Sequence, residues 1–364
     1  MPYQSISKEI AILPPFKEKF SPDDFGSVSL YIKDINENSK FKNKIKVYVN
    51  ITSKTFKGFK SVNLPKNYNH ILFGKNMGHT KSFLKIIKKK VPKIIEIHNR
   101  PKSALKVSQS LIGSKIFLFY HNDPLSFKDC SSVVKRIEIL ENCHSIFFVS
   151  NFLKKRFLEG IPNRYSSKSK LNVIYNGVNL IKQVPLKKKK LNIVYVGELE
   201  KKKGFDIFYE SAVKIIDQFP KWNVHIFGKL KPNTQKLLNK HNKIIFHNFK
   251  KNNFVQEFLK QSSISVVPSV WDEPFGRTLI ESINSGTATI SSNRGGLREI
   301  NKFFKTIKLN KIDKKTIYIA LKKLIMSNDE RSYYSNNNVS KSPFTLNKIT
   351  HILDKYRHEI FSKN

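Results

Sequence analysis

The stretch Ser269–Ile300, SVWDEPFGRTLIESINSGTATISSNRGGLREI, carries the pattern that decides the fold. An apolar run, Ile264–Val267, precedes it and ends at Pro268, as is typical of a buried parallel strand. A helix is expected over Arg277–Asn284, with Gly286 as its stop. A strand, a glycine turn and a helix in this order direct backbone N–H groups and the positive end of the helix dipole toward one point. That point suits an anionic ligand.

Two carboxylates, Glu273 and Glu281, flank the Pro-Phe-Gly turn of this stretch. Glu273 is expected in the turn at the carboxyl end of the strand, and Glu281 about two helical turns further on. Carboxylates placed in this way can accept hydrogen bonds from hydroxyl groups of a polar ligand. A second glycine turn, Arg294–Glu299, follows the next expected strand, Ala288–Ser291.

Length and composition allow two ordinary globular domains. The chain has 364 residues and 39% hydrophobic residues, and no stretch approaches the length of an apolar membrane-spanning helix. The first twenty residues lack the long apolar region of a signal peptide. Cys130 and Cys143 are the only cysteines, too few for a disulfide framework or a zinc site, so we expect a reducing cytoplasm.

The net charge of +40 is shared by both halves of the chain, with +21 in residues 1–185 and +19 in residues 186–364. This even spread favours a Lys-rich solvated surface, and no nucleic-acid-binding motif accompanies the charge. We therefore expect no nucleic acid among the partners. Such a field should still attract anionic membrane surfaces, polyphosphates and acidic glycans.

Short apolar runs alternate with helical patterns along the whole chain. Expected strands in the first half are Ile10–Leu13, Ile45–Val49, His70–Phe73, Ile94–Ile97, Ile116–Phe119 and Ser145–Val149. Those in the second half are Leu191–Val196, Asn223–Phe227, Ile244–Phe246, Ile264–Val267 and Ala288–Ser291. Between them lie helical stretches such as Lys81–Lys90 and Ser131–Leu140. The alternation predicts an α/β fold with two doubly wound parallel sheets, joined by the Lys-rich linker Val184–Lys190.

The paired carboxylates, the Pro-Phe-Gly turn and the later Gly-Gly-Leu turn resemble the donor site of retaining nucleotide-sugar glycosyltransferases, above all glycosyltransferase family 4. The resemblance implies the GT-B fold, in which two Rossmann-like domains face each other across a cleft. It implies an acceptor-side domain over residues 1–185 and a donor-binding domain over residues 186–343. The segment 344–364 is then expected to be a helix that returns to the first domain.

The segment Val196–Gly204, VGELEKKKG, resembles the G-R-L-x3-K-G turn of that family, whose Arg and Lys contact the donor diphosphate. Lys203 matches the Lys, whereas Glu198 stands where the Arg usually does. Either Glu198 turns away from the diphosphate, or the missing charge comes from a nearby cation, which is Lys201, Lys202 or Arg277. Glu281 is implied to hold the ribose hydroxyls. Glu273 is implied to orient the sugar, together with the amides of Phe275 and Gly276.

Four residues of the first half match positions in the family's first domain. Gly26 resembles the glycine that approaches the donor phosphate, although a plain helix start explains it equally well. His121 follows a strand and resembles the active-site His, so His121, Glu273 and Lys203 are the implied catalytic residues. His98 and Arg100 follow another strand and are implied to lie in the cleft on the acceptor side. A structural role remains the alternative for both histidines.

The basic segment Lys81–Lys93 places four apolar residues roughly on one helical face, namely Phe83, Ile86, Ile87 and Val91. That face either packs on a sheet or lies on anionic lipid. Packing is the favoured interpretation, and the two are compatible if only the lysines touch a membrane.

The resemblance implies a retaining transfer of a sugar from a UDP- or GDP-sugar cosubstrate to a hydroxyl of a glycan or lipid-linked acceptor, in lipopolysaccharide or other surface-polysaccharide assembly. No further cofactor is expected. No Asp-x-Asp triplet occurs, which agrees with a metal-independent site. The expected location is the cytoplasm, including the inner face of its membrane. Two alternatives remain open, namely a glycoside phosphorylase or soluble-sugar synthase on the same fold, and a catalytically degenerate protein that binds glycan or nucleotide.

Overall fold

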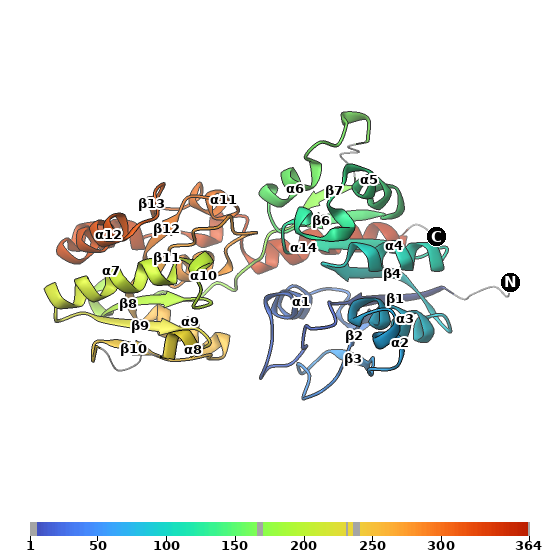
Figure 1. Ribbon diagram of the computed structural model, residues 1–364, viewed down its shortest axis with the longest axis horizontal. Coiled ribbons are helices and arrows are strands. Elements are labelled where there is room, and N and C mark those ends of the chain that lie inside the picture. The colour runs from blue at the N-terminus through green and yellow to red at the C-terminus, as the bar shows by residue number, and fades with distance from the viewer. Residues whose placement is uncertain (1–5, 166–169, 231, 236–240, 363–364) are drawn as a thin grey trace. The chain divides into compact units, whose positions relative to one another are not determined.

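The structure is a computed structural model that describes residues 6–165, 170–230, 232–235 and 241–362. The chain forms two compact units, coloured along the sequence in Figure 1. Unit 1 comprises Met1–Gly177 and Leu346–Asn364, and unit 2 comprises Val178–Thr345. The boundaries predicted after residues 185 and 343 correspond to divisions after Gly177 and Thr345. Among the residues that the structure describes, no helix combines the length and the apolar composition that spanning a bilayer requires.

Unit 1 is built on a seven-stranded sheet with the order β3-β2-β1-β4-β5-β6-β7, in which every neighbouring pair is parallel. Its inner strands are almost continuously buried, because helices cover both faces of the sheet. The strands are β1 Ile6–Leu13, β2 Ile45–Val49, β3 Lys60–Asn63, β4 Val91–His98, β5 Lys115–Tyr120, β6 Ser145–Phe148 and β7 Leu171–Val173.

Helices connect these strands. They are α1 Ser27–Glu37, α2 Asn69–Leu72, α3 Lys75–Ile87, α4 Pro101–Ser110, α5 Val133–Asn142 and α6 Asn151–Leu158, with the short 3-10 turns η1 Lys42–Lys44, η2 Pro124–Ser126, η3 Lys128–Cys130 and η4 Asn163–Tyr165. In α3, Phe83 and Ile87 are buried while Ile86 is exposed, so the apolar face mainly packs inward. Val91 already belongs to β4.

The strand predicted at His70–Phe73 is wrong, because this segment forms the helical turn α2. A run of four apolar residues does not distinguish a strand from a helix. The side chain of Asn67 accepts a hydrogen bond from the Asn69 N–H and starts the turn. Gly74, with φ of 76°, then leads into α3. Most of the run is exposed, whereas a strand in this sheet would be buried.

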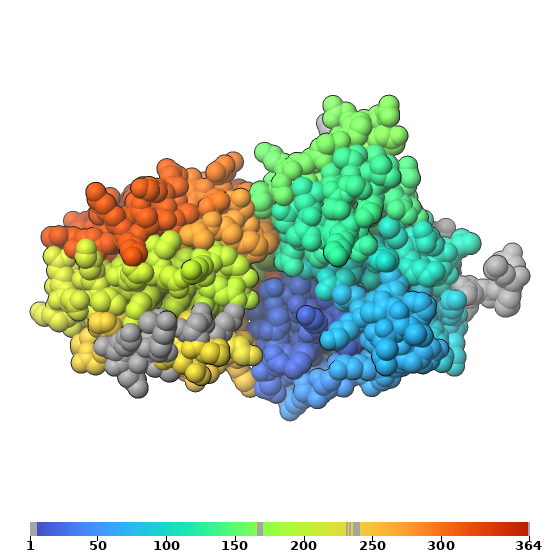
Figure 2. All heavy atoms as spheres, in the orientation of Figure 1, coloured from blue at the N-terminus to red at the C-terminus, as the bar shows by residue number. Residues whose placement is uncertain are grey.

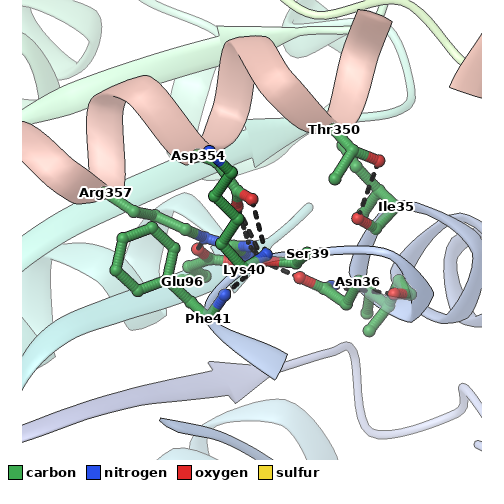
Figure 3. A network of polar contacts seen from close by, with 10 residues as sticks. Ile35, Asn36, Ser39, Lys40, Phe41, Glu96, Thr350, Asp354 and Arg357 are labelled. Atoms are coloured by element: carbon green, nitrogen blue, oxygen red, sulfur yellow. Dashed lines mark hydrogen bonds and ion pairs between the residues drawn. The ribbon is translucent and has the colours of Figure 1, made fainter. Parts of the chain in front are cut away.

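The last helix, α14 Leu346–Ser362, belongs to unit 1 although it follows unit 2 in the sequence. Figure 3 shows the contacts that hold it. The guanidinium of Arg357 donates to both oxygens of Glu96 on β4, from Nε at 2.8 Å and from Nη2 at 2.9 Å. Nη2 also donates to Asn36 of α1 at 2.7 Å. The carboxylate of Asp354 accepts hydrogen bonds from the Ser39 hydroxyl and the Lys40 N–H.

Unit 2 contains a six-stranded parallel sheet with the order β10-β9-β8-β11-β12-β13. Its strands are β8 Lys190–Val196, β9 Asn223–Phe227, β10 Ile244–Phe246, β11 Ser262–Val267, β12 Ala288–Ser292 and β13 Ile307–Leu309. Its helices are α7 Phe205–Gln218, α8 Pro232–Gln235, α9 Asn252–Lys260, α10 Arg277–Asn284, α11 Leu297–Asn301, α12 Lys314–Met326 and α13 Asn328–Ser335, with the 3-10 turns η5 Leu186–Lys188, η6 Lys201–Lys203 and η7 Val339–Lys341.

Both sheets share one topology, and it positions the site. In each sheet the first strand along the chain lies in the middle, with the second strand on one side and the fourth on the other. The connections after β1 and β4 in unit 1, and after β8 and β11 in unit 2, therefore leave the sheet in opposite directions. Doubly wound sheets bind ligands at this switch point, outside the carboxyl ends of the strands.

The buried pair between Arg357 and Glu96 predicts a large asymmetry between single and double variants. Both side chains are almost fully buried, at 0% and 1% exposure. Arg357→Met leaves Glu96 as an uncompensated buried charge, and we expect it to lower the unfolding free energy of unit 1 by about 3–5 kcal/mol. The double variant Arg357→Met/Glu96→Met should regain a large part of that loss. Denaturant unfolding with hydrogen exchange of the unit 1 amides measures both.

Lys355→Met is the matched control, because Lys355 is exposed on the same helix. It should leave the unfolding free energy unchanged within error. A double variant as unstable as Arg357→Met would contradict the assignment of the loss to an unpaired charge.

Candidate functional site

The turns after β8 and β11 are joined through their backbones. The Lys202 carbonyl accepts hydrogen bonds from the N–H groups of Val270 and Trp271, at 3.0 and 3.3 Å. Gly204 has φ of 69°, and a Cβ atom there would lie 2.0 Å from the Pro268 carbonyl oxygen. Only glycine allows this approach. The short turn η6 is therefore held against the carboxyl end of β11.

An ion pair lies between the two turns. Lys203 Nζ is 2.8 Å from Oε1 and 3.0 Å from Oε2 of Glu273. The Ser269 hydroxyl donates to Oε1 of the same carboxylate at 2.6 Å. Glu273 is buried, whereas the Lys203 side chain keeps about a quarter of its surface exposed, at 23%. An ammonium has three donors, so Lys203 can bind a further anion while Glu273 orients it.

A third turn, Asn293–Gly296, supports Glu273 from the side of β12. The Gly296 N–H donates to the Glu273 carbonyl at 2.7 Å. A Cβ atom at Gly295 would lie 2.7 Å from the Glu273 backbone nitrogen, and one at Gly296 would lie 2.6 Å from Phe275 Cα. The Gly-Gly-Leu sequence is thus required by close backbone packing.

Helix α10 carries the second carboxylate. Arg277 Nε lies 2.7 Å from Oε1 of Glu281, one helical turn away, and both side chains are largely buried. The Phe275 ring is buried against Phe344, so only its backbone can serve a ligand. Unit 2 thereby brings together all the residues predicted for the donor, which are Lys203, Glu273, Phe275, Gly276, Arg277 and Glu281.

Glu198, which stands where the family has Arg, is paired with a neighbouring lysine. Lys202 Nζ lies 3.2 Å from Glu198 and 2.9 Å from Glu200. These contacts, with Glu200 first, raise the pKa of Lys202. The Glu198 side chain is more than half exposed. Lys202 therefore neutralises the unusual carboxylate, while Lys203 and Arg277 each hold a carboxylate of the site.

In unit 1, the two strand-end histidines form a buried pair. His98 Nδ1 and His121 Nε2 are 2.8 Å apart. The His98 ring stacks on Phe119, and Tyr31 meets the His121 ring edge-on. His98 is 1% exposed and His121 8%, so His98 supports His121 from beneath. Burial lowers the pKa of His121 to about 3. Burial, then His121 and Arg357, lower the pKa of His98 well below its usual value.

Gly26 begins α1, and a carboxylate of the chain lies beside it. Glu18 Oε2 accepts hydrogen bonds from the Ser29 N–H and hydroxyl, at 3.2 and 3.1 Å. A Cβ atom at Gly26 would lie 2.4 Å from this oxygen. Burial raises the pKa of Glu18, and burial also lowers the pKa of Arg100, which interacts electrostatically with Glu18.

Sequence reasoning missed four residues that shape these sites, which are Glu18, Asn99, Ser269 and Trp271. Asn99 has φ of 53°, and its side-chain oxygen accepts from the backbone N–H groups of His121 and Asn122. Asn is one of the few residues that tolerate this backbone conformation, so Asn99 directly after a strand was a usable signal. The Trp271 ring faces the Lys203 ammonium at 5.0 Å. Nothing local in the sequence pointed to Glu18.

The buried histidine pair predicts a loss of stability in acid. Both histidines are neutral in folded unit 1, whereas the unfolded chain takes up protons below about pH 6.5. Stability is therefore lost as the pH falls from about 6.5 toward 3. At pH 5 each histidine should cost about 2 kcal/mol relative to neutral pH. The pH dependence of denaturant unfolding should be shallower in His121→Gln than in the wild type. His351→Gln, at an exposed position of α14, should keep the wild-type slope, and equal slopes in all three proteins would contradict the assignment.

Comparison with known proteins agrees with this geometry. Residues 179–340, which fall within unit 2, match the family described as glycosyl transferases group 1. Over 237 residues the chain is 27% identical to the protein YtcC of Bacillus subtilis (strain 168). The similarity covers 57% of each protein, so the chain matches little more than half the length of this relative.

Two solved structures share the architecture over 98% of this chain and 100% of their own. Sucrose-phosphate synthase from Thermosynechococcus elongatus has a TM-score of 0.76 at 16% identity. HepE from Anabaena, solved in complex with UDP and glucose, has a TM-score of 0.74 at 14% identity. These similarities confirm the predicted GT-B fold. Through its second unit, the chain belongs to the glycosyl transferases group 1.

Proposed function

We propose that the protein is a retaining glycosyltransferase that moves a sugar from a nucleoside diphosphate to a hydroxyl group. The observation that carries the proposal is the pairing of two cations with two carboxylates at the carboxyl end of β11. Lys203 is paired with Glu273, and Arg277 with Glu281. This arrangement offers positive charge to a diphosphate and oxygen acceptors to the hydroxyls on either side of it.

Each residue has a distinct task in this proposal. Lys203, helped by Arg277, stabilises the negative charge that develops on the diphosphate as the glycosidic C–O bond breaks. Glu281 accepts hydrogen bonds from the ribose hydroxyls, and Glu273 from those of the sugar. The acceptor oxygen attacks the face from which the diphosphate leaves, which retains the configuration. Its proton passes to the leaving phosphate oxygen.

For the acceptor side, we assign His121 as the residue of unit 1 that contacts substrate. His98 is the positioning residue that holds the His121 ring, and Arg100 offers charge to an anionic group. The cosubstrate is a UDP- or GDP-sugar, and the acceptor is a glycan or a lipid-linked glycan of surface-polysaccharide or lipopolysaccharide assembly in the cytoplasm. The two site cations supply the charge that a divalent metal supplies elsewhere, so a chelator should leave the rate unchanged.

The first prediction concerns binding. One of UDP, GDP or ADP should raise the melting temperature of the wild type through mass action. Glu281→Gln removes an ionised acceptor of the ribose hydroxyls, and a hydrogen bond to a charged group contributes about 1.5–3 kcal/mol. The affinity for that nucleotide should therefore fall about tenfold to a hundredfold, measured by titration calorimetry.

Glu257→Gln is the control for this experiment, because it makes the same chemical change at an exposed position of α9 in unit 2. It should bind the nucleotide like the wild type. If no nucleotide shifts the melting temperature at low or high salt, the chain is the degenerate scaffold and the proposal fails.

The second prediction concerns turnover. Lys203→Met should lower kcat for release of the nucleoside diphosphate from the nucleotide sugar by about a hundredfold or more, because the lost charge acts mainly in the transition state. Lys201→Met, at an exposed position of the same turn, should retain activity. Release to water in the absence of an acceptor serves as the assay, and sugar with inorganic phosphate tests the phosphorylase alternative. A Lys203→Met protein as active as the wild type would exclude the assigned role.

A further inference from the structure

Four apolar side chains on and beside α2 face solvent together. Ile71 is 87% exposed, Tyr68 69%, Leu72 67% and Phe73 48%. We refer to these four residues as the α2 patch. Single exposed apolar residues are common on soluble proteins, but consecutive ones that form a contiguous surface mark an interaction site.

The α2 patch is held outward by its packing on α3. The two helices lie side by side in Figure 1. A Cβ atom at Gly78 of α3 would lie 2.6 Å from His70 Cα, so their backbones are in close contact. His70 is the buried residue of α2, and its ring lies 5.1 Å from that of Phe16. Because His70 faces inward, Ile71 and Leu72 face outward.

The surroundings of the α2 patch are strongly basic. Residues 38–95 contain fifteen lysines and neither Asp nor Glu. Lys66 and Lys75 flank the patch in the sequence and are exposed. On α3, the Lys81 ammonium lies over the Phe73 ring, and Lys85 follows one turn later. The spheres of this segment, blue to cyan, lie on the face of unit 1 that Figure 2 shows. The even distribution of charge between the two halves of the chain conceals this local excess.

The α2 patch lies toward the carboxyl edge of the sheet. It comes shortly after the end of β3, and all strands of this sheet are parallel. Phe16, which contacts His70, belongs to the loop after β1 and so lies at the same edge. His121 and Arg100 follow β5 and β4 at this edge as well. The patch and the assigned acceptor residues therefore belong to one side of unit 1.

We infer that the α2 patch docks unit 1 on an anionic lipid surface. One helical turn that presents apolar side chains at up to 87% exposure is a projection, not a groove that could hold a peptide. Apolar side chains gain free energy at the boundary of headgroups and acyl chains, and the lysines are attracted to anionic headgroups. An acidic protein surface would use the lysines but would leave the apolar side chains without a matching partner.

The inference deepens the proposed function, on which its consequence for the acceptor rests. Docking by the α2 patch places the carboxyl edge of unit 1 next to the membrane surface. The acceptor is then a glycan whose other end is anchored in lipid, presented to His121 and Arg100 from the bilayer.

Vesicle co-sedimentation of the full chain without nucleotide tests the inference. The protein should bind vesicles of phosphatidylcholine mixed with phosphatidylglycerol and bind phosphatidylcholine alone far more weakly. Ile71→Ser/Leu72→Ser should lower the partition coefficient at least about tenfold, since two large apolar side chains no longer enter the interface. Lys75→Gln/Lys81→Gln/Lys85→Gln should lower it by about a hundredfold on the mixed vesicles.

Ile112→Ser is the matched control for the apolar change. Ile112 is 91% exposed, also in unit 1, but it precedes β5 and so lies at the amino edge of the sheet. It should bind like the wild type. A Leu72→Trp variant adds a direct readout, because its fluorescence should shift to the blue and be quenched by brominated lipid. Melting curves of all variants show whether they fold.

Three outcomes would overturn the inference, namely absence of vesicle binding, equal binding to neutral and anionic vesicles, or wild-type binding by Ile71→Ser/Leu72→Ser. Vesicle binding lost equally in Ile112→Ser would likewise exclude the α2 patch as the contact. Since nucleotide is absent, these outcomes are independent of the melting-temperature test of the donor site. Vesicle binding without any nucleotide effect would support docking and reject the proposed function.

Discussion

Close backbone approach at the carboxyl end of β11 is the constraint on which the donor site depends. Gly204 brings the first turn of unit 2 against the Pro268 carbonyl, and Gly295 and Gly296 bring the third turn against Glu273 and Phe275. A side chain at any of these positions would separate the turns by at least the width of a methyl group. Glu273 is therefore fixed by main-chain contacts from both neighbouring strands, which is more rigid support than side chains alone provide.

The charges of unit 2 follow from that geometry. A buried carboxylate is costly without a partner, and the turn after β8 supplies Lys203 at hydrogen-bond distance from Glu273. Arg277 does the same for Glu281 within α10. The unusual Glu198 does not disturb this arrangement, because it lies outside the pair and binds Lys202. The substitution thus removes an Arg from the turn without leaving an unpaired carboxylate beside the proposed diphosphate position.

Sequence patterns predicted well what depends on local order. The strands β2 and β9 and the helix α10 have the predicted bounds, since buried apolar runs and a glycine stop are local signals. The α2 turn was missed because four apolar residues fit two periods, and the exposure that separates them depends on distant packing. The His98–His121 contact joins two strands that the sequence shows only as consecutive. Glu18 beside Gly26, and Arg357 on Glu96, depend on tertiary structure in the same way.

The place of α14 in the sequence has a consequence for the order in which the chain folds. Unit 2 is one continuous segment and can close its sheet as soon as it has been synthesised. Unit 1 cannot, because Glu96 lacks its cation until Arg357 emerges, after all of Val178–Thr345. During translation unit 1 therefore waits with an uncompensated carboxylate and an open apolar face between β4 and α1. The unit made first is completed last, and this interval is when a chaperone has most to protect.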